Sequence, residues 1–156
     1  MAPMEPAMPP MEIALREARA AAARGEVPVG AVVTDAAGSV LARAGNEVEA
    51  RRDPSAHAEM LALRAAATAA GDKVLPAATL WVTLEPCAMC AAAASFFRVR
   101  RVVFGAYDPK GGGVEHGPRL FAQPTCHHAP EVVGGVRETE AAALLRDFFA
   151  GLRPRG

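Results

Sequence analysis

The sequence predicts an α/β fold in which helices cover both faces of one central sheet. Three observations lead to this prediction. Helical and strand patterns follow the order α-β-β-α-β-α-β-β-α, which is typical of a three-layer α/β/α domain. The chain has 156 residues, a length that suits one domain with a single core. Apolar residues make up 51% of the chain, but many are alanines, which favour helices that pack closely.

The start of the chain and its composition limit the class of protein. Residues 1–10 read MAPMEPAMPP, which lacks the basic and apolar stretches of a secretory signal, and these prolines indicate a loose lead-in. We therefore expect a single domain over residues 11–156. No run of about 18 apolar residues occurs, so no membrane span is expected. Three cysteines, two of them in C-x-x-C, fit a reducing compartment and a cytoplasmic protein.

The first third of the chain predicts a helix followed by a hairpin. Residues 11–24 show the helical spacing of apolar side chains, and Gly25 suits the end of that helix. Two β-branched runs, 29–34 and 39–44, flank the turn D-A-A-G and so predict paired strands. Residues 46–54 are polar and are expected to form a loop.

The middle of the chain predicts a helix that carries reactive side chains. Ser55 is expected to cap this helix, which contains His57 and Glu59 and ends near residue 70. Bulky and β-branched residues then predict a strand at 79–84. Reactive groups are thus expected where loops turn into regular structure.

The last part of the chain completes the alternation. The helix 87–97 follows a proline, which suits a first turn, and it is apolar nearly all round, so we expect it to be buried. Strands are expected at 101–105 and 131–136, and an amphipathic helix at 138–152. Residues 107–130 form a loop rich in Gly and Pro, and a loop this long in a compact domain is typically functional.

H-A-E at residues 57–59 and P-C-A-M-C at 86–90 are the most informative pieces of the sequence. Three nitrogen or sulfur ligands, His57, Cys87 and Cys90, leave a fourth position open, as in catalytic zinc sites. The cysteines are three residues apart, so one face of a helix start carries both, and its positive end favours thiolates. Strands that lead into these helices place the metal at a carboxyl edge of the sheet.

Glu59 is the remaining group of the motif, and we expect it to move protons. H-x-E together with P-C-x-x-C matches the signature of zinc-dependent nucleobase deaminases, so the expected reaction is hydrolytic deamination. That reaction needs hydroxide at neutral pH, which a zinc ion supplies by lowering the pKa of its water to about 7. Glu59 is expected to take a proton from the attacking water, to protonate the ring nitrogen and then to protonate the departing amine. Burial raises the pKa of a carboxyl group, which suits this duty.

Other interpretations compete with the catalytic one. A lone H-x-E is usually only a helix face, and a lone C-x-x-C is also typical of redox pairs, but a redox pair leaves His57 and Glu59 without a role. The run Cys126-His127-His128 offers a fourth zinc ligand, which would make the site structural and the protein a binding module without catalysis. We expect instead that these histidines face substrate or solvent.

Charge adds a constraint on partners. The chain has 17 Lys and Arg residues and 17 Asp and Glu residues, whereas proteins that rely on nonspecific phosphate contacts are usually basic. Any basic surface must therefore be local, although each cation taken singly is more often a solvated side chain. The candidates are Arg98, Arg100, Arg101, Lys110, Arg119, Arg146, Arg153 and Arg155.

Nearly the whole chain after the first ten residues resembles the bacterial tRNA adenosine deaminases, a branch of the cytidine and deoxycytidylate deaminase superfamily. H-A-E and P-C-x-x-C form the general signature of zinc-dependent nucleobase deaminases. More specific to the tRNA group are four segments of the sequence: EVPVGAV, TLEPCAMC, FGAYDPK and the terminal DFF. These enzymes convert adenosine to inosine at the wobble position 34 of the anticodon.

The resemblance implies a cytidine-deaminase-like fold with a central five-stranded mixed sheet, a homodimer and one Zn²⁺ per subunit. It agrees with the chemistry assigned above to the H-A-E and P-C-x-x-C residues. It implies that Asn46 contacts the target nucleoside. The residues expected to wall the pocket or hold flanking anticodon nucleotides are Pro28, Val29, Ala58, Asp108, Lys110 and Phe149. The partner implied is a tRNA anticodon stem-loop, with no membrane and no DNA.

Two further expectations concern assembly and substrate. The helix 88–97 is apolar on more faces than one small core needs, which favours a symmetric homodimer. The alternative function is a metabolic deaminase of a free base or nucleoside, of the guanine or cytosine type. The loop GGGVEHGPRLFAQPTCHH departs from the pattern of the tRNA group, because His127 stands about where that group has Asn. This departure concerns RNA contacts and leaves the zinc chemistry intact.

Overall fold

The computed structural model describes residues 8–152. Most of the expected lead-in, and Arg153 and Arg155 of the expected basic tail, therefore lie outside the described residues. The elements follow the predicted order, with a short helix and a 3-10 turn added. They are α1 (Pro10–Ala23), β1 (Gly30–Thr34), β2 (Val40–Gly45), α2 (Val48–Arg51), α3 (Ala58–Ala70), β3 (Thr79–Leu84), α4 (Ala88–Phe96), β4 (Arg101–Ala106), η1 (Leu120–Ala122), β5 (Glu131–Val133) and α5 (Glu138–Leu152).

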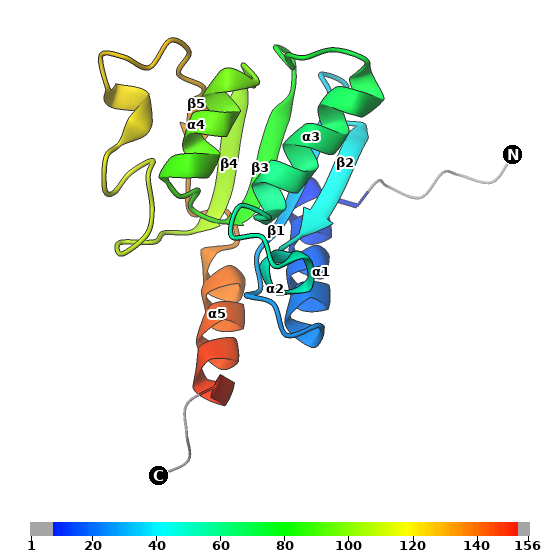
Figure 1. The fold of residues 1–156 in the computed structure, drawn as a ribbon, viewed down its shortest axis with the longest axis vertical. Helices are drawn as coiled ribbons and strands as arrows, with labels where there is room; N and C mark the ends of the chain where they lie inside the picture. The colour runs from blue at the N-terminus through cyan, green and yellow to red at the C-terminus, as the bar shows by residue number, and fades with distance from the viewer. Residues whose placement is uncertain (1–7, 153–156) are drawn as a thin grey trace, which may run out of the picture.

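The strands form one five-stranded mixed sheet in the order β2-β1-β3-β4-β5. β1 pairs antiparallel with both β2 and β3, whereas β3, β4 and β5 run parallel to one another. α3 and α4 cover one face of this sheet, and α1 and α5 pack on the other (Figure 1). The predicted α/β/α fold with its mixed sheet is confirmed.

Two apolar clusters form the core, one on each side of the sheet. The larger cluster lies under α3 and α4 and includes Leu63, Leu80 and Phe104, each fully buried. The smaller cluster joins α1 and α5 to the sheet and is centred on Leu15 and Val32. α5 projects beyond the ends of the strands (Figure 1), which leaves part of its surface free to border a site.

The close packing of α1 on the sheet depends on two glycines. A Cβ atom on Gly30 would lie 1.9 Å from the carbonyl oxygen of Ala14, and one on Gly45 would lie 2.8 Å from that of Glu17. The helix therefore rests directly on the strand backbones, a contact that no local pattern in the sequence indicates.

Five local expectations are corrected by the structure. Residues 46–54 do not form only a loop, because they contain α2. Glu26 stabilises this short helix by accepting the N–H groups of Glu49 and Ala50 at 2.9 Å each. A cap supplied from 23 residues away leaves no trace in the local sequence. The loop after β4 likewise contains the turn η1.

The N-cap of α3 is His57 and not Ser55. The Ser55 hydroxyl and N–H both turn back to an Asp53 carboxylate oxygen, at 2.7 and 2.8 Å. β5 ends at Val133, three residues earlier than expected, because two glycines follow and Gly135 adopts a positive φ of 81°. These differences shift the bounds of elements without changing their order.

α4 is not buried all round. Met89 is 36% exposed and Phe96 is 78% exposed, so the expectation of a fully buried helix is wrong for one face. None of the helices in the described part of the chain is both long and apolar enough to cross a membrane.

Candidate active site

The three expected zinc ligands meet where two helices begin. His57 and Cys87 are the N-cap residues of α3 and α4, and both have an extended backbone. Cys90 lies one turn into α4 and is buried. The strand β3 ends at Leu84, so the cluster sits at a carboxyl edge of the sheet, where α/β folds commonly bind ligands.

The spacing of the ligand atoms fits a zinc ion. The Nδ1 atom of His57 lies 3.6 Å from the sulfur of Cys87 and 3.5 Å from that of Cys90. Tetrahedral bonds of about 2.3 Å to sulfur and about 2.0–2.1 Å to nitrogen separate the two donors by about 3.6 Å. Within residues 8–152, no other Cys, His, Asp or Glu joins this cluster, which leaves a fourth coordination position for a non-protein ligand.

Cys87 favours the thiolate, which a cation can bind, whereas Cys90 favours the neutral thiol. A hydrogen bond from Cys90 lowers the pKa of the Cys87 thiol to about 4. The same contact, together with burial, raises the pKa of Cys90, and the contact with Cys87 raises that of His57. Protons are therefore shared among these three side chains, and binding of a divalent cation would displace them. Cys87 and Cys90 are free thiols, and the imidazole of His57 lies within 3.6 Å of both sulfurs, a contact that a redox pair alone does not explain.

Glu59 lies in the first turn of α3, beside the cluster. Its side chain is only 4% exposed, and burial raises its pKa to about 7. A carboxyl group with this pKa gives and takes protons with similar ease at neutral pH. Glu59 borders the same hollow as His57 and Cys87, so a proton carrier and two ligands face one space.

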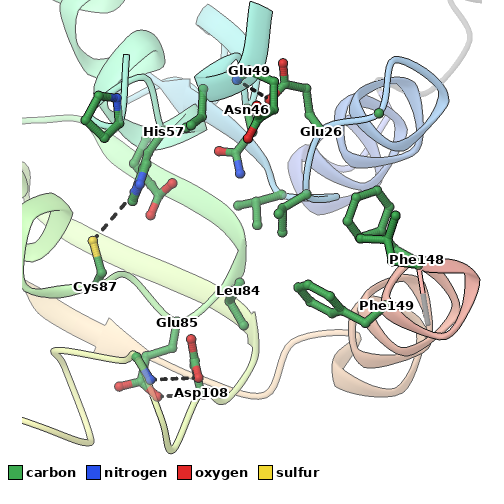
Figure 2. Close-up of a pocket in the computed structure, with 18 residues that line it drawn as sticks. Glu26, Asn46, Glu49, His57, Leu84, Glu85, Cys87, Asp108, Phe148 and Phe149 are labelled. Atoms are coloured by element: carbon green, nitrogen blue, oxygen red, sulfur yellow. Dashed lines mark hydrogen bonds between the residues drawn. The ribbon is translucent and has the colours of Figure 1, made fainter. Parts of the chain in front are cut away.

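A hollow of about 520 Å³ opens from the cluster toward α5. We call its inner end the floor: His57, Glu59 and Cys87 line it, and the fully buried Cys90 lies behind them. Its outer end is the mouth, where Phe148 and Phe149 of α5 face the floor across the space (Figure 2). Phe149 is 48% exposed. A second hollow of about 460 Å³ adjoins the mouth and is lined by Tyr107, Asp108, Lys110 and Phe149, among others.

Asn46 borders the hollow with a fixed amide. Its side-chain oxygen accepts the N–H of Ala58 at 2.8 Å, so the two N–H bonds of the amide group remain for a ligand. Val29 also lines the hollow, whereas Pro28 and Ala58 are buried beside it. Asp108 and Phe149 are at the mouth, and Lys110 lies in the adjoining hollow.

Several lining residues were missed in the sequence. They include Glu26, Val27, Leu84, Glu85, Phe148 and Leu152. Glu85 immediately precedes P-C-x-x-C, and this position is the one hint that could have pointed to it. Burial alone would raise its pKa, but hydrogen bonds from Asp108 and His116 outweigh burial and hold the pKa of Glu85 below its usual range.

The C-H-H run lies away from the floor. The Cys126 sulfur is 3.6 Å from the Ser95 hydroxyl, and His128 Nε2 is 2.7 Å from the Val99 carbonyl oxygen. Cys126, His127 and His128 instead line a separate hollow of about 290 Å³ next to Phe96. The fourth protein ligand that the competing structural interpretation requires is thus not supplied by this run. The three-ligand centre and the fold place the protein in the class of zinc-dependent deaminases.

Comparison with known proteins gives the family. Residues 4–106 match the cytidine and deoxycytidylate deaminase zinc-binding region. A tRNA-specific adenosine deaminase of Agrobacterium fabrum is 58% identical over 140 residues, covering 89% of this chain and 91% of the relative. The one from Bacillus subtilis is 46% identical over 145 residues, covering 93% and 89%. The chain belongs to this family of zinc deaminases and, within it, to the tRNA-specific adenosine deaminases.

Solved structures agree with this assignment. A structure from a study of A-to-I editing by tRNA:A34 deaminases at the wobble position superposes with a TM-score of 0.85. It is 56% identical and covers 87% of this chain and 98% of that one. A guanine deaminase from Nitrosomonas europaea superposes with a TM-score of 0.79 at 27% identity, covering 96% and 88%.

Proposed function

We propose that this enzyme converts adenosine to inosine at position 34 of a tRNA anticodon, in the cytoplasm, using one zinc ion per subunit. The observation that carries the proposal is the continuity of the hollow, which runs from the His57–Cys87 pair to the exposed aromatic face of α5. A nucleotide flipped out of an RNA loop needs an open mouth and rings on which neighbouring bases stack. Free bases fit a closed pocket better.

In this proposal His57, Cys87 and Cys90 hold the zinc. A zinc ion bound there would supply hydroxide at neutral pH, because zinc lowers the pKa of water. Glu59 takes one proton from the attacking water and delivers it to N1 of the adenine ring as the C6–O bond forms. Glu59 then carries the second proton to the exocyclic amine, the C6–N bond breaks, and the products are inosine and ammonia.

The other pocket residues hold the substrate in place. The amide N–H groups of Asn46 donate to an acceptor on the target nucleoside, because the amide oxygen is already committed to Ala58. Val29 provides apolar wall around the base, with Pro28 and Ala58 packed behind. At the mouth, Asp108, Lys110 and Phe149 hold the nucleotides that flank the target.

Assembly is proposed to be a symmetric homodimer that uses α4. The exposed apolar side chains of Met89 and Phe96, together with Ala88 and Ala92, form a stripe along this helix, and the 290 Å³ hollow lies beside Phe96. A second copy of the same face can bury this stripe. Phe96→Ser should yield monomers in sedimentation velocity, and a concentration-independent monomer of the unchanged protein would contradict the dimer.

The test of function is direct. A synthetic anticodon stem-loop with adenosine at position 34 is incubated with the zinc-loaded enzyme, and inosine is measured by mass spectrometry. The controls are the same stem-loop with guanosine at position 34, free adenosine, and the free bases guanine and cytosine. Conversion of the first RNA with little activity on free adenosine is the expected result. Efficient deamination of guanine or cytosine with the stem-loop untouched overturns the proposal in favour of a metabolic deaminase.

A further inference from the structure

One buried carboxylate in the protein has more partners than its place beside the metal ligands explains. Glu85 is 2% exposed and lies between the end of β3 and the turn that carries Cys87. Five hydrogen bonds converge on its two oxygens. They come from the backbone N–H groups of Asp108 (3.1 Å), Val114 (3.2 Å), Glu115 (2.9 Å) and His116 (3.1 Å) and from the ring Nδ1 of His116 (2.8 Å).

The segment that donates these bonds packs directly on the ligand turn. A Cβ atom on Gly112 would lie 2.3 Å from a Glu85 oxygen, and one on Gly113 would lie 2.6 Å from the backbone nitrogen of Ala88. The N–H of Gly113 also donates to the Pro86 carbonyl oxygen at 2.8 Å. The glycine run of this loop is therefore required, because any side chain there would separate the loop from the carboxylate.

The same segment forms one side of the mouth. Asp108 and Gly111 line the main hollow, and Lys110 lines the adjoining one. An Asp108 carboxylate oxygen accepts the N–H groups of Lys110 at 3.2 Å and Gly111 at 2.9 Å, which fixes the turn that carries the lysine. Figure 2 shows the bond between Glu85 and the backbone of Asp108 at the lower end of the hollow.

The ring of His116 extends the contact to an aromatic side chain. It meets the ring of Tyr107 edge-on, with centroids 6.2 Å apart, and Tyr107 in turn meets Phe104 edge-on at 5.0 Å. Tyr107 is 41% exposed and borders the second hollow. One carboxylate thus supports both the charged and the aromatic parts of this side of the mouth.

We propose that Glu85 is a positioning residue for substrate recognition: it holds residues 107–116 in place so that Asp108, Lys110 and Tyr107 meet the nucleotides beside the target. This role rests on the proposed function. Glu85 is not a zinc ligand, and its carboxylate is directed to the loop. Loss of its hydrogen bonds should therefore raise KM for the RNA and leave the chemical step at the floor largely intact.

The sharpest variant is Glu85→Gln, which keeps the shape of the side chain. One oxygen receives two donors and the other receives three, so a glutamine NH₂ group faces N–H donors whichever way the amide turns. We expect KM for the stem-loop to rise about 10–100-fold, because a displaced loop loses its contacts with the flanking nucleotides and the loss of one stacked base alone weakens binding by about that factor. The value of kcat should stay within a factor of about three, and zinc content should be unchanged.

Two controls separate positioning from general damage. Glu115→Gln changes an exposed carboxylate in the same loop and should leave KM, kcat and zinc as they are. A double-mutant cycle with Lys110→Ala tests the route: if Glu85 acts by placing Lys110, the two changes together raise KM less than the product of their single effects. Hydrogen exchange should show faster exchange at residues 108–116 in Glu85→Gln, with α3 and α4 unaffected.

The outcomes are distinguishable. Three results would overturn the proposal if the wild-type enzyme still edits the stem-loop. The first is a parallel fall in kcat and zinc content in Glu85→Gln. The others are a KM that does not rise in that variant and full additivity with Lys110→Ala. Failure of the wild-type enzyme on the stem-loop overturns the proposed function itself. If Glu85→Gln does not fold, His116→Ala removes one of the five hydrogen bonds and should raise KM in the same direction by a smaller factor; no rise in that variant overturns the role.

Discussion

The floor and the mouth of the hollow are held in different ways. At the floor, four side chains come from the starts of two adjacent helices, the distances between ligand atoms are 3.5–3.6 Å, and Glu59 and Cys90 are buried. At the mouth, α5 and the loop after β4 meet residues from the start of the chain, and Phe149 is about half exposed. Catalysis needs reactive groups at fixed distances, whereas binding a large substrate needs an accessible surface. The floor meets the first requirement and the mouth meets the second.

The largest effect should come from removing the metal at the floor. His57→Ala takes away one of three ligands and should reduce bound zinc and bring deamination to background. Because the metal binds the folded protein more tightly than the unfolded chain, the midpoint of thermal unfolding should also fall. Zinc is measured by mass spectrometry of the metal and turnover by inosine. Stoichiometric zinc and normal turnover in this variant would show that the ligand set is wrong.

The next largest effect should come from Glu59→Gln. This change keeps the shape and removes the proton carrier, so turnover should fall about 10²–10⁴-fold. Zinc content should not change, and stability should be equal or higher, because the neutral amide avoids the cost of burying charge. Together with His57→Ala, this variant separates metal binding from proton transfer within the floor. A folded, zinc-loaded protein with near-normal turnover would contradict the assignment.

Lowering the pH should reduce catalysis at the floor before it weakens RNA binding at the mouth. Glu59 has a raised pKa of about 7 and must be ionised to accept the first proton, so kcat should decline as the pH falls below about 7. At one pH unit below this pKa, the ionised fraction is about one-tenth. The dissociation constant of the stem-loop should change less over this range. A kcat that is level from pH 7.5 to 5.5 would show that another group takes the proton.

The same contrast explains what the sequence could reveal. The floor residues are close in sequence within each motif, and zinc chemistry restricts which side chains can serve, so all four could be named from their spacing. The mouth depends on contacts between distant segments. Glu26 caps α2, Glu85 anchors the loop after β4, and Phe148 reaches the hollow only because α5 packs beside β4. Amphipathic spacing predicted α5, but not which of its side chains would face a ligand.

At the mouth, the largest single contribution is expected from Phe149. Base stacking on an aromatic side chain is worth about 1–3 kcal/mol, so Phe149→Ala should weaken stem-loop binding by about 5–150-fold. Zinc content and the single-turnover rate at saturating RNA should stay the same. Val133→Ala, which removes exposed apolar surface from β5, is the matched control. If Phe149→Ala lowers the rate of the bound complex instead, the ring acts on the chemistry and the division between floor and mouth fails.

The smallest effect is expected from Lys110. This residue sharpens the comparison between floor and mouth, because the salt dependence of binding reports directly on its charge. The chain is neutral overall and contains two lysines, Lys73 and Lys110, of which Lys110 borders the mouth. If it neutralises one phosphate beside the target, Lys110→Ala should weaken binding and reduce the slope of log K against log salt by about 0.7–0.9. Lys73→Ala, in the turn after α3, should leave both quantities unchanged. Fluorescence anisotropy at several salt concentrations measures this slope. A slope equal to that of the wild-type protein would show that Lys110 does not contact a phosphate. Recognition at the mouth would then depend on stacking and hydrogen bonds.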